Sequence, residues 1–154
     1  MNNILVCYFS ASGNTKRVAE NLASTIQGEL FEIEPVEKYT QEDLDYTNKE
    51  SRTTIEMTQN IKPEIKNTIP NIDNYNQVCI GFPIWWYKEP TIIDKFLEDN
   101  DLSGKQIYVF ATSGSSTIES TINNLKENYP NLNFVNAKRF SGNEDKQEYS
   151  SLIN

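Results

Sequence analysis

The chain has 154 residues, enough for one domain with a hydrophobic core. Its formal net charge of −8 argues against nucleic acid as a partner, because phosphate binding relies on basic patches. The sequence contains no histidine, which excludes Ser-His-Asp and Cys-His catalysis and histidine-ligated metal sites.

The sequence has no apolar run of about 18 residues, so we predict no membrane-spanning helix. Its first residues lack the basic segment and the cleavage site of a signal peptide, and we expect a cytoplasmic protein. Cys7 and Cys79 each lie in an apolar run and not in a CxxC pair. We therefore expect two buried side chains in adjacent strands and no metal site.

Short apolar runs alternate with amphipathic stretches along the chain. Helices are expected at 14–26, closed by Gly28, then from Pro90 onward, and along Ile118, Ile122 and Leu125 until Pro130. The polar segment 38–76 is expected to be a crossover with weak helical signals at 41–46 and 51–59, and the tail 141–154 to hold one short helix. Strands are expected at 3–9, 30–36, 77–82, 106–111 and 133–140.

This alternation of strands and helices predicts an α/β fold, with a mostly parallel sheet and helices on both of its faces. Right-handed crossovers leave few topologies for such a sheet. We expect residues 1–154 to form a single domain.

The first strand is followed at once by a segment rich in small polar residues, which also opens the first helix: Ser10, Ser12, Gly13, Asn14 and Thr15. Backbone N–H groups and the helix dipole converge at such a position and favour an anion. The segment matches neither the Walker A loop nor the GxGxxG fingerprint. It is typical of a bound phosphate monoester, and a plain helix cap is the alternative interpretation.

With this segment the chain resembles the flavodoxin family, in a bacterial short-chain branch. The resemblance covers about residues 3–125 and implies a three-layer sandwich with a five-stranded parallel sheet of order 2-1-3-4-5. It also implies one noncovalent FMN at the switch point of the sheet, and flavodoxin is the usual example of this arrangement. The other matching residues are Arg52, Glu56, Lys62-Pro63, Gly81 to Trp86, Pro90, Phe96 to Glu98, Gly104-Lys105 and Phe110 to Gly114.

A second candidate segment follows the third strand and comprises Pro83, Ile84, Trp85, Trp86 and Tyr87. Three consecutive aromatic residues in a loop suit a wall for the flat isoalloxazine ring of FMN. The sequence does not distinguish which tryptophan would stack, and one of them could instead pack beneath a neighbouring helix. The segment contains no glycine, so a positive φ within it is expected to be costly.

A third candidate segment, Thr112, Ser113 and Gly114, follows the fourth strand. Its N–H groups and hydroxyls could bond the pyrimidine edge of the flavin, or simply cap the next helix. The segment carries no aromatic residue. The second face of the ring is therefore expected to be open, or covered by the crossover segment or by a partner.

These features predict an FMN-binding electron-transfer protein without catalytic residues of its own. The alternative is an FMN-dependent NAD(P)H or quinone oxidoreductase on the same fold, although the sequence shows no basic cluster for a dinucleotide phosphate. A third possibility is a binding module without redox chemistry. We expect a monomer whose partners are redox proteins, and its acidic charge favours partners with basic surfaces.

Overall fold

The computed structural model describes residues 3–113 and 117–153. Five parallel strands form one sheet in the order β2-β1-β3-β4-β5, which confirms the predicted fold class and strand order. The strands are β1 (Ile4–Tyr8), β2 (Glu29–Glu32), β3 (Gln77–Pro83), β4 (Gln106–Thr112) and β5 (Asn133–Arg139).

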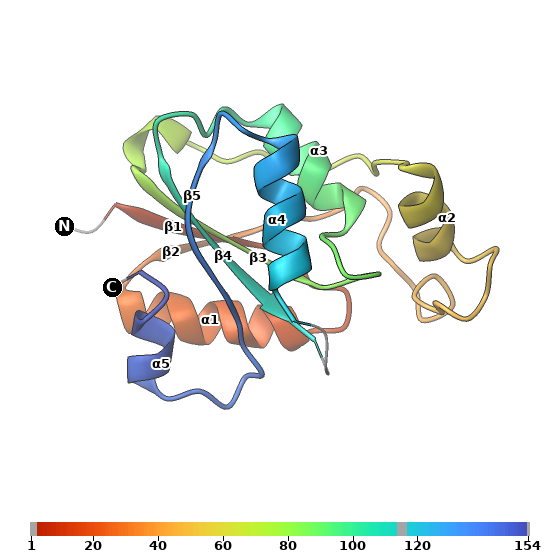
Figure 1. Cartoon of the computed structure of the whole chain (residues 1–154), viewed down its shortest axis with the longest axis horizontal. Coiled ribbons are helices and arrows are strands. Elements are labelled where there is room, and N and C mark those ends of the chain that lie inside the picture. Colours follow the sequence, from red (N-terminus) through yellow and green to blue (C-terminus); the bar gives the residue numbers. More distant parts are fainter. Residues whose placement is uncertain (1–2, 114–116, 154) are drawn as a thin grey trace.

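Helices cover both faces of this sheet. Helices α1 and α5 cover one face of the sheet and α3 and α4 cover the other, and α2 stands to one side in Figure 1. No helix in the described ranges is long and apolar enough to cross a membrane. The helices are α1 (Asn14–Ile26), α2 (Arg52–Gln59), α3 (Thr91–Asp99), α4 (Glu119–Asn128) and α5 (Lys146–Ser150), with a short 3-10 helix at Ile72–Asn74.

The sheet separates two halves of the core. Every residue of β1 is buried, and successive side chains alternate between the half that contains α1 and the half that contains α3. Cys7 belongs to one half and Cys79, on the adjacent strand β3, belongs to the other. Both cysteines are free and buried, as the sequence predicted.

Segment 38–76 departs from the sequence-based prediction. The weak helix expected at 41–46 was wrong, because this stretch forms turns, whereas the helix expected at 51–59 is α2. The side chains of Thr40 and Asp43 each accept a hydrogen bond from the other's backbone N–H. Such local side-chain bonds compete with the helical backbone pattern.

Two element ends also differ. The strand expected at 30–36 stops at Glu32, shortly before Pro35, which cannot donate to a ladder. Gln27, and not Gly28, takes the left-handed conformation that ends α1, with φ of 58°. Gly28 lies against β1, where a Cβ would come within 3.1 Å of Val6 Cγ2. Close packing against the strand therefore explains the glycine.

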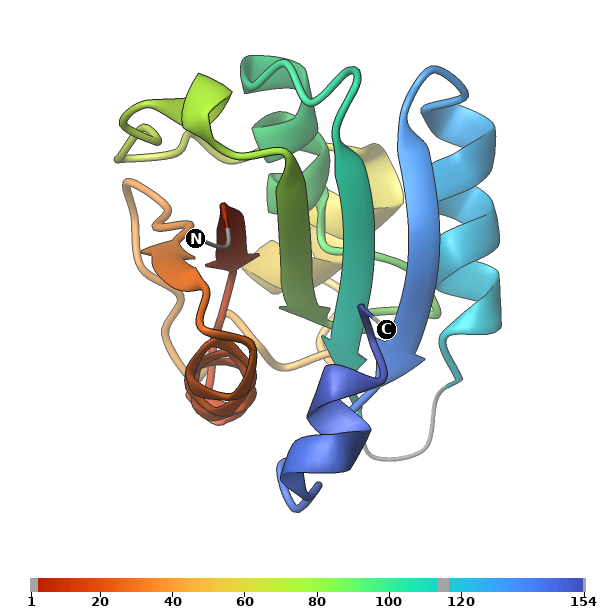
Figure 2. The same ribbon diagram turned by 90° about the vertical axis from the view of Figure 1, so that its left-hand side faces the viewer.

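The parallel arrangement brings the three candidate segments to one edge of the sheet. The arrowheads of β3, β4 and β5 point to the same end in Figure 2. Strand β2 lies on one side of β1 and β3 on the other, so the strand order reverses at β1. Ligands bind at such switch points in this class of fold.

Candidate functional site

The loop after β1 leads into α1 without a side-chain cap. Gly13 precedes α1 with φ of 97°, and its N–H donates to Ser10 Oγ at 3.0 Å. No side chain caps the helix at Gly13, and its first turn contains no acidic residue. Backbone N–H groups of the first turn have no acceptor within a helix, so they are available to a ligand. Ser12 and Asn14 are exposed beside them.

Thr112, the last residue of β4, joins the three candidate segments. Its Oγ1 lies 2.7 Å from Thr15 Oγ1, and both side chains are buried. Its carbonyl accepts a hydrogen bond from Ile84 N at 3.0 Å. The hydroxyl of Thr15, which the sequence suggested as a phosphate donor, is therefore already bonded inside the protein.

The aromatic segment after β3 forms a tight turn. Trp85 and Lys88 exchange two backbone hydrogen bonds of 3.0 Å each. Between them, Trp86 and Tyr87 have φ of 49° and 65°, the signature of a type I′ turn. Asn and Gly usually occupy these positions, and non-glycine residues there store on the order of 1–3 kcal/mol each. Backbone strain of this kind is typical of functional sites.

The two tryptophans have different environments. Trp85 packs edge-on against Phe9 and Tyr39, with ring centroids 5.7 and 5.6 Å away. Trp86 is 40% exposed and Tyr87 is 69% exposed. Trp85 is thus held from within the protein, whereas the turn presents Trp86 and Tyr87 to a ligand or to solvent.

Tyr39 is itself clamped by α2. Its hydroxyl donates to Glu56 Oε1 at 2.5 Å, and Arg52 bonds the other oxygen of Glu56 at 2.9 Å. The Arg52 guanidinium also lies 3.8 Å from the centre of the Tyr39 ring. Burial and the bond to Glu56 raise the pKa of Tyr39, which stays protonated. No sequence pattern pointed to Tyr39, although the four-residue spacing of Arg52 and Glu56 is a local signal for their pairing.

The crossover segment also borders a pocket of about 300 Å³ beside the aromatic turn. Tyr46, which is 75% exposed, comes from the crossover segment and lines this pocket together with the turn. The aromatic side chains that line the pocket therefore come from both segments. The lining residues are Leu44, Tyr46, Thr53, Ile84, Trp85, Trp86 and Tyr87.

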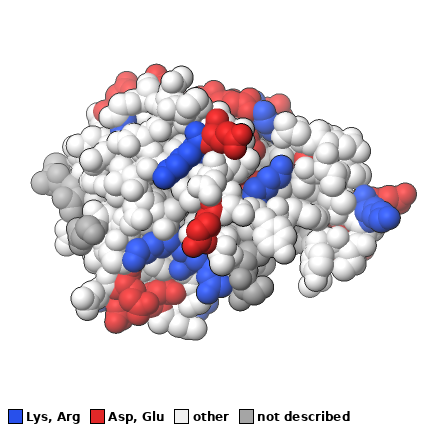
Figure 3. All heavy atoms as spheres, viewed as in Figure 1, with Lys and Arg blue, Asp and Glu red and all other residues white. Residues whose placement is uncertain are grey.

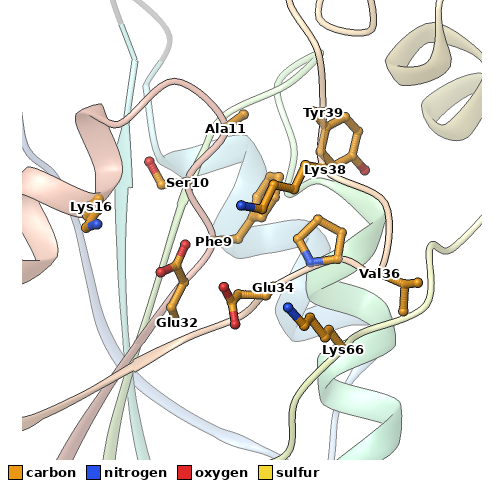
Figure 4. Close-up of a pocket in the computed structure, with 11 residues that line it drawn as sticks. Phe9, Ser10, Ala11, Lys16, Glu32, Glu34, Val36, Lys38, Tyr39 and Lys66 are labelled. Atoms are coloured by element: carbon orange, nitrogen blue, oxygen red, sulfur yellow. The ribbon is translucent and has the colours of Figure 1, made fainter.

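A second pocket, of about 320 Å³, lies next to Ser10 (Figure 4). Three lysines from separate parts of the chain line it, which the sequence had not indicated. Two carboxylates, Glu32 and Glu34, line the same space and offset most of that charge. The mixed charges do not favour a dedicated anion site. The lysines are Lys16, Lys38 and Lys66.

Helix α4 anchors the far end of the aromatic turn. Thr121 Oγ1 donates to the carbonyl of Tyr87 at 3.0 Å, and Asn124 Nδ2 donates to the carboxylate of Glu89 at 2.9 Å. Glu89 is only 1% exposed. Burial, reinforced by the nearby carboxyl of Asp94, raises the pKa of Glu89 to about 8. A buried, proton-holding carboxyl thus sits two residues beyond Tyr87.

The segment after β4 is described only in part. Thr112 is buried at the edge of the sheet, and the carbonyl of Ser113 accepts a hydrogen bond of 3.4 Å from Arg139. Gly114, the remaining candidate, lies outside the described residues. Of the predicted site residues, the structure brings together those at 10–15, 83–87 and 112–113.

A family model for flavodoxin matches residues 3–154. The chain belongs to the flavodoxin family. The match extends through the C-terminal tail, which the motifs had not covered. A search of curated proteins found no match for this flavodoxin-family chain.

Solved structures resemble the same chain closely. A protein of Bacteroides eggerthii is 41% identical with a TM-score of 0.94, over 98% of this chain and 95% of its own. A Bacteroides uniformis protein is 37% identical with a TM-score of 0.92, and the match covers 99% of this chain and 97% of that protein. A flavoprotein of Lactobacillus acidophilus, solved in complex with FMN, is 25% identical with a TM-score of 0.80 and covers both chains completely.

Proposed function

We propose that this flavodoxin-family protein binds one FMN noncovalently and carries electrons between redox partners. One observation carries the proposal: the loop after β1 and the aromatic turn meet at Thr112, on one edge of the sheet. A phosphate group and a flat ring are the two ends of FMN. The FMN complex of the Lactobacillus acidophilus relative supports this choice of ligand.

The residues present fit this cofactor. We assign its phosphate to Ser10, Ser12, Gly13, Asn14 and Thr15, where uncapped N–H groups meet the positive end of α1. Thr15 would contribute its backbone N–H, because its hydroxyl is bonded to Thr112. FMN supplies reversible electron storage when bound, and the protein holds and orients it. We assign the ring to Pro83, Ile84, Trp85, Trp86 and Tyr87, and its pyrimidine edge to Thr112, Ser113 and Gly114.

The chain's own residues have three tasks in this proposal. The loop after β1 holds the phosphate, and the turn at 85–88 excludes water from one face of the ring. The Tyr39 clamp fixes Trp85, so the wall keeps its shape when the ring leaves. None of these residues needs to react covalently.

The partners of such a carrier are expected to be redox proteins. The net charge of −8 favours association with basic surfaces, which steers encounter at low ionic strength. On the face shown in Figure 3, basic and acidic side chains of the described residues lie side by side, without a large patch of one sign. Overall charge, and not a patch on this face, therefore supports the proposal.

A second candidate function is an FMN-dependent NAD(P)H or quinone oxidoreductase. It is supported by the 300 Å³ pocket between Tyr46 and the aromatic turn, because a carrier needs no separate substrate space. The apolar and aromatic lining suits a planar acceptor such as a quinone.

Flavin binding is tested by titrating the flavin-free protein with FMN and following the quenching of flavin fluorescence. We expect saturable binding, and we expect Ser12→Ala to weaken it because a hydroxyl beside the phosphate is lost. Absence of flavin bands from the purified protein, together with no binding of added FMN, would contradict the proposal.

The two redox functions are separated by supplying NAD(P)H to the flavin-loaded protein. A carrier is expected to be reduced only when a flavodoxin reductase is added. Direct, steady oxidation of NAD(P)H in the presence of a quinone would instead establish the oxidoreductase.

A further inference from the structure

The C-terminal segment forms a compact turn beside the start of α1. Glu144 Oε2 accepts hydrogen bonds from the backbone N–H and the hydroxyl of Ser141, at 2.7 and 3.0 Å, and Glu144 Oε1 accepts from Gly142 N at 2.8 Å. Tyr149 of α5 packs against Phe140, with ring centroids 5.0 Å apart. The turn is therefore fixed both by its own bonds and by the helix that follows it.

The guanidinium group of Arg17 packs against this turn, which we call its seat. Arg17 Nη2 donates to the carbonyl of Ser141 at 3.4 Å. Gly142 has φ of 105°, and a Cβ at this position would lie 2.3 Å from Arg17 Nη2 and 2.8 Å from its Cζ. Only glycine leaves room for the guanidinium at this distance.

The seated guanidinium fixes the orientation of Asn14. Arg17 Nη2 also donates to Asn14 Oδ1 at 3.0 Å. A guanidinium has donors and no acceptor, so the amide atom facing it must be the oxygen. The amide Nδ2 then faces away from Arg17, with no acceptor among the residues that the structure describes. Asn14 is thus held as a donor at the first position of α1.

We propose that Arg17, seated on the turn at Ser141–Glu144, is a positioning residue for the phosphate of the cofactor. It acts through Asn14, whose amide N–H groups it turns toward the anion. The inference rests on the proposed function, in which that phosphate occupies the loop at 10–15. It assigns a role to the C-terminal segment, which lies more than 120 residues along the chain from that loop.

The negative net charge of the protein makes a positive charge near the phosphate useful. A phosphate monoester carries about −1.5 to −2 charges near neutral pH. The protein carries a net charge of −8, and the loop at 10–15 itself contains no charged residue. Arg17 brings one fixed positive charge to the first turn of α1 and holds a neutral donor in place.

The test compares FMN with riboflavin, which has the same ring and no phosphate. We expect Arg17→Ala to raise the dissociation constant for FMN by about tenfold. This is the effect of losing one hydrogen bond to a charged group, here the bond from the Asn14 amide to the phosphate. Binding of riboflavin is expected to stay unchanged. Lys126→Ala removes one positive charge from the exposed side of α4 and serves as the control for net charge.

A double variant tests whether Arg17 acts through Asn14. Asn14→Ala alone is expected to weaken FMN binding, and adding Arg17→Ala is expected to cause little further loss, because residues in one network are not additive. Losses that simply multiply would overturn the positioning role.

The seat is tested with Gly142→Ala, which is expected to weaken FMN binding by displacing Arg17. Gly104→Ala is the matched control, because Gly104 also has a positive φ, of 79°, but nothing lies within 4 Å of an added Cβ. Equal losses for FMN and riboflavin, or unchanged FMN binding in both Gly142→Ala and Arg17→Ala, would overturn the inference. Failure of the unaltered protein to bind either flavin would contradict the proposed function instead.

Discussion

Thr112 shows how one side chain can organise a whole site. Its hydroxyl bonds Thr15 across 97 positions of sequence, and its carbonyl bonds Ile84. The hydroxyl pair is buried, so each partner depends on the other for its hydrogen bond. The geometry of the loop after β1 is therefore tied to the end of β4.

We expect Thr112→Val to lower the free energy of unfolding by about 1–3 kcal/mol, because it leaves the buried Thr15 hydroxyl unpaired. FMN affinity should fall with it. Urea unfolding and a flavin titration measure the two effects. The double variant Thr15→Val, Thr112→Val is expected to recover most of the stability, because both hydroxyls are then removed together. A double variant no more stable than Thr112→Val would argue against the paired hydroxyls.

The candidate residues could be predicted from the sequence, but their pairings could not. Thr15 and Thr112 each stood out as a polar residue after a buried strand. No local pattern indicates that they bond each other, or that Arg17 reaches Ser141. Such contacts depend on the three-dimensional register of strands, which periodicity does not encode.

The turn at 85–88 illustrates a conflict between local preference and position. Trp86 and Tyr87 occupy the two sites where a type I′ turn needs positive φ. The turn nevertheless forms, because Trp85 is packed on Phe9 and Tyr39 and the carbonyl of Tyr87 is bonded by Thr121. The surrounding structure thus imposes a conformation that the sequence disfavours.

We expect the double variant Trp86→Asn, Tyr87→Gly to be more stable than the natural chain by roughly 1–2 kcal/mol, since Asn-Gly is the preferred type I′ pair. Its FMN affinity is expected to fall, because both exposed rings are lost. Thermal unfolding and flavin titration check the two directions. A loss of stability would show that the rings, and not the backbone, dominate this turn.

The helices and strands with a clear apolar periodicity could be predicted from the sequence. The buried strands and the amphipathic helices α1, α3 and α4 carry clear apolar patterns, and their positions were predicted within a few residues. Segment 38–76 carries no such pattern. Its order comes from single contacts such as the bond from Tyr39 to Glu56, which joins the start of this segment to α2 within it.

On the scale of the whole molecule, Glu89 couples folding to pH. Its carboxyl is buried between α3 and α4, facing Asp94, Asn124 and Tyr129, with Lys62, Lys88 and Glu98 on the same pocket. Its pKa rises from an ordinary value of 4.5 to about 8 in the fold. Between these values the folded protein keeps a proton that the unfolded chain releases.

The contribution of Glu89 to stability is therefore complete below pH 4.5 and declines as the pH rises toward about 8. We expect Glu89→Gln to flatten this decline, so that the variant gains stability relative to the natural protein as the pH increases. Urea unfolding of both proteins between pH 5 and pH 9 measures the difference. Parallel stability curves would show that Glu89 does not titrate in this range.

The two buried cysteines can report on local opening of the fold. Burial raises the pKa of Cys7 and Cys79, so neither presents a reactive thiolate while the sheet is intact. They occupy adjacent central strands but opposite halves of the core. A thiol reagent can reach them only when the corresponding half opens, and identifying which sulfur is labelled first would show which helical layer separates from the sheet first.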